Sequence, residues 1–176
     1  ASDSQVMLSD RQRLLKALSY TEEALQMVDS THVVSARIHE TRMRIFSDLG
    51  DTGELAVEFH TAISAALSHF GRSGMHPYVA ELHCILGSLL ASHDQIPNAR
   101  KHLELARKLA SRILGPRHLI LASYTADVAR IEMKDGDTFG AFEHYQQALM
   151  LIFQTIGRES LEAANILCEM ARIKSM

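Results

Sequence analysis

The stretch that decides the fold covers residues 76–117 and reads HPYVAELHCILGSLLASHDQIPNARKHLELARKLASRILGPR. Apolar residues recur in it at intervals of three and four, the spacing of helices that bury one face. Pro77 and Pro97 stand where the first turn of a helix accepts proline, and Gly115 with Pro116 breaks the pattern. The stretch therefore predicts a hairpin of two antiparallel helices.

The pattern of this hairpin recurs along the chain with a period of 42 residues, the separation of Gly115 from Gly157. GPRHLILA begins at Gly115 and GRESLEAA begins at Gly157, and His76 precedes His118 by the same interval. A further helix at 54–70 fits the pattern with a register slip of one or two residues. Periods of this size indicate stacked helical repeats, in which neighbours bury a continuous core between them.

Breaks rich in Gly, Pro or Asp divide the chain into eight predicted helices. These cover residues 8–28, 31–48, 54–70, 77–92, 97–113, 117–134, 138–155 and 159–175. No apolar alternation of period two is sustained, so an all-α fold is predicted. We expect an N-terminal capping helix in residues 1–30 and repeats over 31–176, divided into 31–72, 76–114, 118–156 and a partial 159–176.

Small residues recur at the positions where paired helices would cross. Ala99 and Ala106 stand on one helix, and Ala141 and Ala148 follow them at the repeat interval. A glycine inside a helix costs about 1 kcal/mol relative to alanine. Gly87 is therefore predicted to serve close helix packing, because small side chains let two helix axes approach.

The chain has 176 residues, of which 47% are hydrophobic and 22% charged, with a formal net charge of -3. This balance is typical of a folded globular protein and argues against nucleic-acid binding by the whole domain. No window approaches the apolar length that spans a membrane. The first residues, ASDSQVMLSDRQR, lack the apolar core of a signal peptide. Neither a nucleic-acid partner nor a membrane is expected.

The two cysteines, Cys84 and Cys168, occupy the same position in two repeats that a third repeat separates. Stacked helices lie roughly 10 Å apart, so the thiols should lie beyond the Cα separation of about 7 Å that a disulfide allows. We expect reduced cysteines and a cytoplasmic location, with association with the cytoskeleton left open.

The repeats resemble tetratricopeptide (TPR) repeats, whose pattern is a Leu-Gly pair, a turn residue, Ala, a large apolar residue and Ala. The pattern is carried by Leu86, Gly87, Asp94, Ala99, Leu103 and Ala106, and again by Val128, Ala129, Gly136, Ala141, Tyr145 and Ala148. The 42-residue period and the His-Pro-x-Val-Ala opening at residues 76–80 are similar to the kinesin-light-chain type. The resemblance implies a right-handed superhelix of antiparallel helix pairs that acts as a protein-interaction scaffold.

A second resemblance is to the C-terminal TPR-like domain of SET-and-MYND lysine methyltransferases, carried by HFGRSGMHPYVAEL and IPNARKHLELARKLASRILGPRHLIL. It implies an accessory domain rather than the enzyme, because the chain has no zinc-ligand cysteine clusters and no recognisable SET-type active-site motif. A purely structural assembly scaffold is the third function left open. In all three cases the chain is expected to carry no catalytic residue, cofactor or metal site.

In such arrays the first helix of each pair lines the concave surface, where partner peptides usually bind. Counting from the inner positions Leu86 and Gly87 predicts the side chains on this surface. They are Arg44, Glu81, Cys84, Ser88, Ser92, Ser123, Ala126, Arg130, Met133, Lys134, Asn165, Cys168 and Arg172. Arg44, Arg130 and Arg172 would form a basic stripe, and arginine pairs well with carboxylates and phosphates. An acidic peptide is one expected partner; a solvated charged face would give the same pattern.

Two recognition devices known from TPR proteins are not expected here. Chaperone-binding repeats carry an Asn and a Lys or Arg clamp at places where this chain has Ser88 and Cys84. Kinesin light chains carry paired asparagines, and the equivalent places here hold Cys84 and Ile85, Ala126 and Asp127, and Cys168 and Glu169. Recognition of a C-terminal carboxylate or of that cargo-peptide type is therefore not predicted.

The hairpin at 97–117 is locally basic. It contains Arg100, Lys101, Arg107, Lys108, Arg112 and Arg117, with Glu104 as its single acid. A charged outer helix face explains this most simply, and contact with an acidic partner is the alternative. The ten histidines include no pair with the spacing of metal ligands, so His76 and His118 are predicted to cap helices.

The last predicted helix, 159–175, resembles the first helix of a repeat without its second. Its apolar residues Ile166, Leu167, Met170 and Ile173 are then expected to be partly uncovered. Burying each such side chain is worth roughly 1.5–3 kcal/mol. A longer array, or a homo-oligomer that forms through this helix, is therefore predicted.

Overall fold

The computed structural model describes residues 9–175, and this part of the chain is all-helical, with no strand. The helices are α1 (Asp10–Gln26), α2 (Val33–Leu49), α3 (Thr52–Phe70), α4 (Pro77–Ser92), α5 (Ile96–Leu114), α6 (Leu119–Asp135), α7 (Thr138–Thr155) and α8 (Leu161–Lys174). All eight predicted helices are present, and each predicted end lies within two residues of the observed one. No helix in the described part has both the length and the apolarity needed to cross a membrane.

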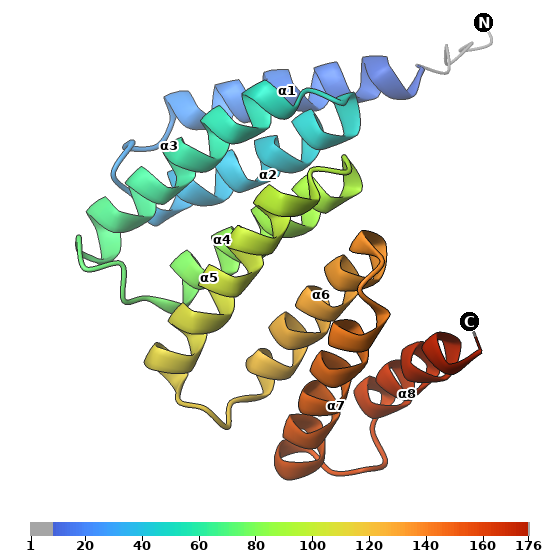
Figure 1. Ribbon diagram of the computed structural model, residues 1–176. Coiled ribbons are helices and arrows are strands. Elements are labelled where there is room, and N and C mark those ends of the chain that lie inside the picture. Colours follow the sequence, from blue (N-terminus) through green and yellow to red (C-terminus); the bar gives the residue numbers. More distant parts are fainter. Residues whose placement is uncertain (1–8, 176) are drawn as a thin grey trace, which may run out of the picture. The chain divides into compact units, whose positions relative to one another are not determined.

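The chain forms two compact units, Ala1–Ser73 and Gly74–Met176. In the first unit, α2 and α3 pair as an antiparallel hairpin and α1 packs along α2 (Figure 1). The core of this unit contains Met43 from α2 and Leu55 from α3, both fully buried. The division between the units falls in the turn between the first two predicted repeats.

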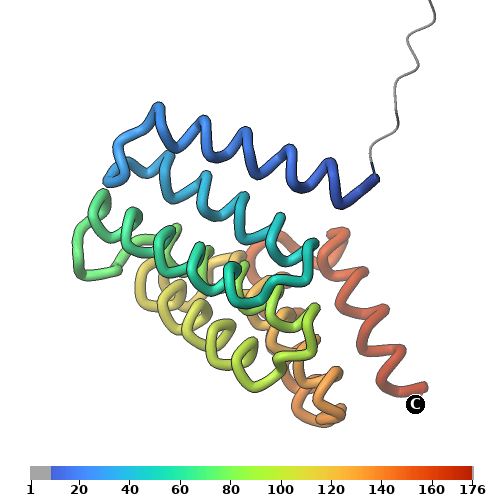
Figure 2. The backbone as a smooth tube through the Cα atoms, turned by 90° about the horizontal axis from the view of Figure 1, so that it is seen from above, coloured from blue at the N-terminus to red at the C-terminus, as the bar shows by residue number. Residues whose placement is uncertain are grey.

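The second unit carries the candidate site. It consists of the hairpins α4–α5 and α6–α7, with α5 packed on α6, α4 also touching α6, and α8 packed on α7. Figure 2 follows this succession of helices along the tube from green to red. The last three helices share a core of buried residues: Ala122, Ala129, Ala141, Tyr145, Ala148, Ile152, Ala163 and Ile166.

Small residues set the distance between paired helices, as predicted. Ala99, Ala106, Ala141 and Ala148 are at most 1% exposed. A Cβ atom added to Gly87 would lie 2.7 Å from Cγ of Leu103 and 3.1 Å from the carbonyl oxygen of Ala99. The first separation is shorter than real Cβ atoms show and the second is tight, so α4 and α5 can cross this closely because residue 87 is glycine.

Histidines begin three of the helices. Nδ1 of His32, His76 and His118 each accepts a hydrogen bond from the backbone N–H two residues further on, at 3.2 Å. The first N–H groups of a helix have no partner within the helix, and a side-chain acceptor satisfies one of them. The predicted capping role of His76 and His118 is therefore confirmed.

Polar pairs that include buried carboxylates or half-buried histidines join the two helices of each hairpin. In α2–α3, Nδ1 of His39 and Nε of Arg42 contact the Glu58 carboxylate at 2.6 and 2.7 Å. In α6–α7, Nδ1 of His144 lies 2.6 Å from Oε2 of Glu132. Burial opposes ionisation of Glu58, but its bonds to His39 and Arg42 outweigh this and hold its pKa below the usual value.

The α4–α5 hairpin has two histidines where α2–α3 has a histidine and a carboxylate. Nδ1 of His83 lies 3.0 Å from Nδ1 of His102, and the two rings are stacked. Burial, reinforced by repulsion from His102, lowers the pKa of His83 to about 4. The His83 imidazole is therefore neutral at neutral pH.

Candidate interaction groove

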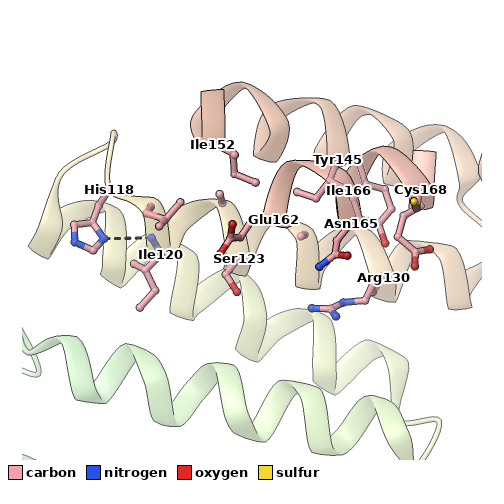
Figure 3. Close-up of a pocket in the computed structure, with 14 residues that line it drawn as sticks. His118, Ile120, Ser123, Arg130, Tyr145, Ile152, Glu162, Asn165, Ile166 and Cys168 are labelled. Carbon is pink, nitrogen blue, oxygen red and sulfur yellow. Dashed lines mark hydrogen bonds between the residues drawn. The ribbon is translucent and has the colours of Figure 1, made fainter. Parts of the chain in front are cut away.

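A groove of about 750 Å³ runs between α6 and α8 in the second unit. Its floor includes Tyr145 and Ile152 of α7 together with Ile166 of α8. In Figure 3, Ser123 and Arg130 on α6 and Glu162 and Asn165 on α8 surround the same opening. We call this space the α6–α8 groove; it combines an apolar floor with a polar rim.

Several residues predicted for the concave surface do line this groove. They are Ser123, Ala126, Arg130, Asn165 and Cys168. A smaller hollow of about 250 Å³ lies between α4 and α6 and is bordered by Ser88, Ser92, Arg130 and Lys134. Arg130 borders both spaces. The structure thus brings together side chains of three consecutive first helices, as the repeat spacing predicts.

Asp127 links Arg130 to Cys84 at the edge of the groove. Arg130 forms an ion pair with Asp127, and the thiol of Cys84 donates a hydrogen bond to Oδ2 of Asp127 at 3.4 Å. Burial raises the pKa of Cys84 to about 11, so this thiol stays protonated and weakly reactive at neutral pH. Cys84 therefore supports the wall of the groove.

The predicted basic stripe of arginines is not a row of unpaired cations. Arg44 contacts Glu40 at 3.2 Å and Arg172 contacts Glu169 at 3.0 Å, each pair lying along one helix, as does the pair of Arg130 with Asp127. Arg44 also belongs to the first unit, whereas the other two arginines belong to the second. The stripe is therefore corrected to three local ion pairs.

Three other candidates have structural contacts or lie outside the groove. Nζ of Lys134 donates a hydrogen bond to the carbonyl oxygen of Ala91 at 2.7 Å and so caps the end of α4. Met133 packs against the core of α6, α7 and α8. Glu81 is exposed on α4 and lines neither the α6–α8 groove nor the smaller hollow.

On α8, the expectation of a partly uncovered apolar face holds for Leu167, Met170 and Ile173 and fails for Ile166. Ile166 is 7% exposed and belongs to the core with α6 and α7, so its predicted exposure is wrong. The residues of α7 cover it, because α8 packs on α7 as a further helix of the stack. Leu167 is 48% exposed, and Met170 and Ile173 are half-buried against the same core.

Sequence reasoning missed the hydroxyl of Tyr145. The repeat spacing predicts a buried aromatic ring at this position, and the residue is 2% exposed. The residue lines the floor of the groove, but its Oη atom is buried and has no hydrogen-bond partner among the described residues. Burial, reinforced by the nearby Glu169, raises the pKa of Tyr145, so the hydroxyl keeps its proton. The spacing carries no signal for an unsatisfied donor.

The described residues contain no group of three or more His, Cys, Asp or Glu side chains that could hold a metal ion. Cys84 and Cys168 are both free.

Comparison with known proteins identifies the fold. No family model matches this sequence, and no curated protein matches it. The crystal structure of BtubC (BKLC) from P. vanneervenii superposes with a TM-score of 0.78 over 96% of this chain and 67% of that chain, at 17% identity. A crystal structure of the TPR-like repeats of a Podospora anserina kinesin light chain gives a TM-score of 0.71 over 92% and 76%, also at 17% identity.

Both neighbours have kinesin-light-chain-like repeats, in agreement with the first resemblance. Neither is a SET-and-MYND protein, so the second resemblance gains no support from them. At 17% identity the similarity to these two structures supports a shared fold but gives no information about binding partners. The chain is a helical-repeat protein with a TPR-like fold similar to that of these two structures.

Proposed function

We propose that this protein is a non-catalytic interaction scaffold that binds a peptide or helix of a partner protein in the α6–α8 groove. The fold is one whose repeats present extended binding surfaces. The groove has room for several side chains of a bound segment. A cytoplasmic location, with or without the cytoskeleton, remains a prediction.

The observation that carries this proposal is the unpartnered Tyr145 hydroxyl in the groove floor. Leaving a buried polar group without a hydrogen bond costs about 1–3 kcal/mol. Access to this hydroxyl requires the side chains that cover it to move, and a bound segment that displaced them and placed a carbonyl oxygen against it would recover that cost. The protonated state of Tyr145 suits it to donate to such an acceptor.

The rim of the groove indicates what kind of segment fits. Ser123 and Asn165 offer hydroxyl and amide groups that can pair with a peptide backbone. Glu162 also lines the groove and takes part in no ion pair among residues 9–175, whereas Arg130 and Glu169 are paired with neighbours. These charges give no reason to expect an acidic segment here.

The test uses peptides selected from a random displayed library against the whole protein. Ser123→Arg places a long charged side chain in the groove and should weaken the selected peptides by about tenfold or more. Tyr145→Phe keeps the ring and removes the donor, so it should weaken them by a smaller factor. Gln146→Arg, at an exposed position of α7 that does not line the groove, is the control and should leave affinity unchanged. Selected peptides that bind Ser123→Arg as tightly as the wild type would refute the proposal.

Self-association through α8, which also underlies a purely structural role, is a second candidate. It is supported by the exposure of Leu161 and Leu167, at 74% and 48%. Light scattering after size-exclusion chromatography should give a dimer or larger species that Leu167→Glu returns to a monomer. A monomer at the highest attainable concentration would exclude this candidate and leave the groove proposal intact.

A further inference from the structure

A second hollow, of about 640 Å³, lies between α5, α6 and α7. Three cations of α5 line it: Arg107, Lys108 and Arg112. Gln147 and Gln154 of α7 face the same space, and Met150 contributes to its apolar part. We call it the α5–α7 hollow. It draws together the basic residues of the 97–117 hairpin with amide groups that lie two helices later in the chain.

The charge in this hollow is uncompensated by the residues around it. No carboxylate lines it. Arg107 and Arg112 take part in no ion pair within residues 9–175, and Lys108 has a contact of 4.0 Å with Glu104 along its own helix. Exposed ion pairs at such distances contribute little. The cations repel one another because they lie close together, and a bound anion would offset this repulsion.

One buried donor of a residue that lines the hollow lacks a partner. Nε of Arg107 is buried and makes no hydrogen bond in the described part of the chain. The planar guanidinium group has five N–H donors in a fork that matches the oxygens of a carboxylate or phosphate. Arg112 carries the same fork, and the Gln147 and Gln154 amides add neutral donors. The site is therefore rich in donors and holds no anionic acceptor.

We propose that the α5–α7 hollow binds the oxyanion of an acidic protein segment, a carboxylate or a phosphorylated side chain. The apolar lining, which includes Met150, would receive a neighbouring side chain of that segment. A nucleic acid fits less well, because no aromatic ring lines the hollow for a base to stack on. A bilayer fits less well too, because the apolar groups lie within a concavity.

The experiment titrates the full chain with fluorescently labelled peptides of one sequence in three forms: glutamate-rich, phosphoserine-containing, and neutral with Gln and Ser in those places. Lys108→Gln with Arg112→Gln removes two cations of the hollow. Lys101→Gln with Arg117→Gln removes two cations of the same hairpin that do not line it. Arg107 is left unchanged because its side chain is part of the packing. Circular dichroism melts check that both double variants are folded.

We expect an acidic form to bind and the neutral form not to bind. The hollow variant should lose about tenfold or more in affinity, since a hydrogen bond to a charged group is worth at least a factor of ten, and the control should lose less than about twofold. The stronger of the two acidic forms identifies the oxyanion as phosphate or carboxylate. Equal losses in both double variants, or no binding of either acidic form, would overturn the proposal. So would tighter, hollow-dependent binding of oligouridine or phosphatidylserine vesicles.

Discussion

The α6–α8 groove and the α5–α7 hollow belong to the same unit and both use α6, yet their chemistry differs. Charges at the groove are mostly paired along their own helices, as in Arg130 with Asp127. Charges at the hollow, such as Arg107 and Arg112, have no such partners among the described residues. The groove therefore suits a segment recognised through its backbone and apolar side chains, whereas the hollow suits an anion.

The difference follows from how many acidic residues each helix supplies to its own arginines. Arg130 and Arg172 follow Asp127 and Glu169 by three positions and pair with them. Arg112 follows no acidic residue at three or four positions. Glu104 precedes both Arg107 and Lys108, but its contact is with Lys108. The number of arginines on a surface therefore indicates anion binding only after the arginines paired with acids of their own helix have been left out of the count.

The largest expected effect concerns the scaffold that both sites share. Gly87→Val would push a side chain into Leu103 and the backbone of Ala99, and overpacking of this kind costs about 2–3 kcal/mol. Urea unfolding followed by circular dichroism should show this loss of unfolding free energy. Ser88→Val, at the adjacent exposed position, should change it by less than about 0.5 kcal/mol. A fully stable Gly87→Val protein would contradict the packing described for α4 and α5.

Lowering the pH should destabilise the α4–α5 hairpin, whose second helix lines the α5–α7 hollow. The folded pKa of His83, about 4, lies below the ordinary value of 6.5, so the unfolded chain binds this proton more readily. Its contribution to stability is present above pH 6.5 and is lost as the pH falls toward 4, amounting to about 2 kcal/mol by about pH 4.5. The difference in unfolding free energy between pH 7 and 4.5 should therefore shrink in His83→Gln. An identical pH dependence in both proteins would show that the His83–His102 pair does not titrate in this way.

The independence of the two sites can be tested by exchanging their variants and probes. Ser123→Arg should weaken a groove-selected peptide about tenfold and an acidic peptide less than about twofold. Lys108→Gln with Arg112→Gln should do the reverse. Fluorescence anisotropy with both probes measures all four affinities. If each variant weakened both probes alike, the two spaces would have to be treated as one binding surface.

The smallest expected effect is a difference in salt dependence. Raising NaCl from about 0.05 to 0.3 M shortens the screening length, so acidic-peptide affinity should fall several-fold. Affinity of a groove-selected peptide should change by less than about twofold, because its contacts are mainly hydrogen bonds and apolar packing. Parallel salt titrations of the two peptides provide the measurement. Salt responses of equal slope would remove the chemical distinction between the sites.

Much of the fold and part of the candidate site could be predicted from the sequence. The repeat period located the helices, Gly87 marked a close crossing, and His76 and His118 marked helix starts. Ser123, Arg130 and Asn165, which were predicted for the concave surface, line one space in the structure. The pairing of the three arginines of the predicted stripe could also have been read from the acids at three or four positions before them, since those spacings are local.

The sequence by itself determined the elements, because helix periodicity, breaks and caps depend on residues within a few positions of one another. Tertiary structure alone decided which polar groups remain without partners. The hydroxyl of Tyr145 is buried without a partner, and Lys134 donates to the carbonyl oxygen of Ala91, 43 positions earlier in the chain. Gln147 and Gln154 joined the cations of α5 for the same reason. Contacts between residues far apart in the sequence arise from helix packing, so a local sequence pattern cannot predict them.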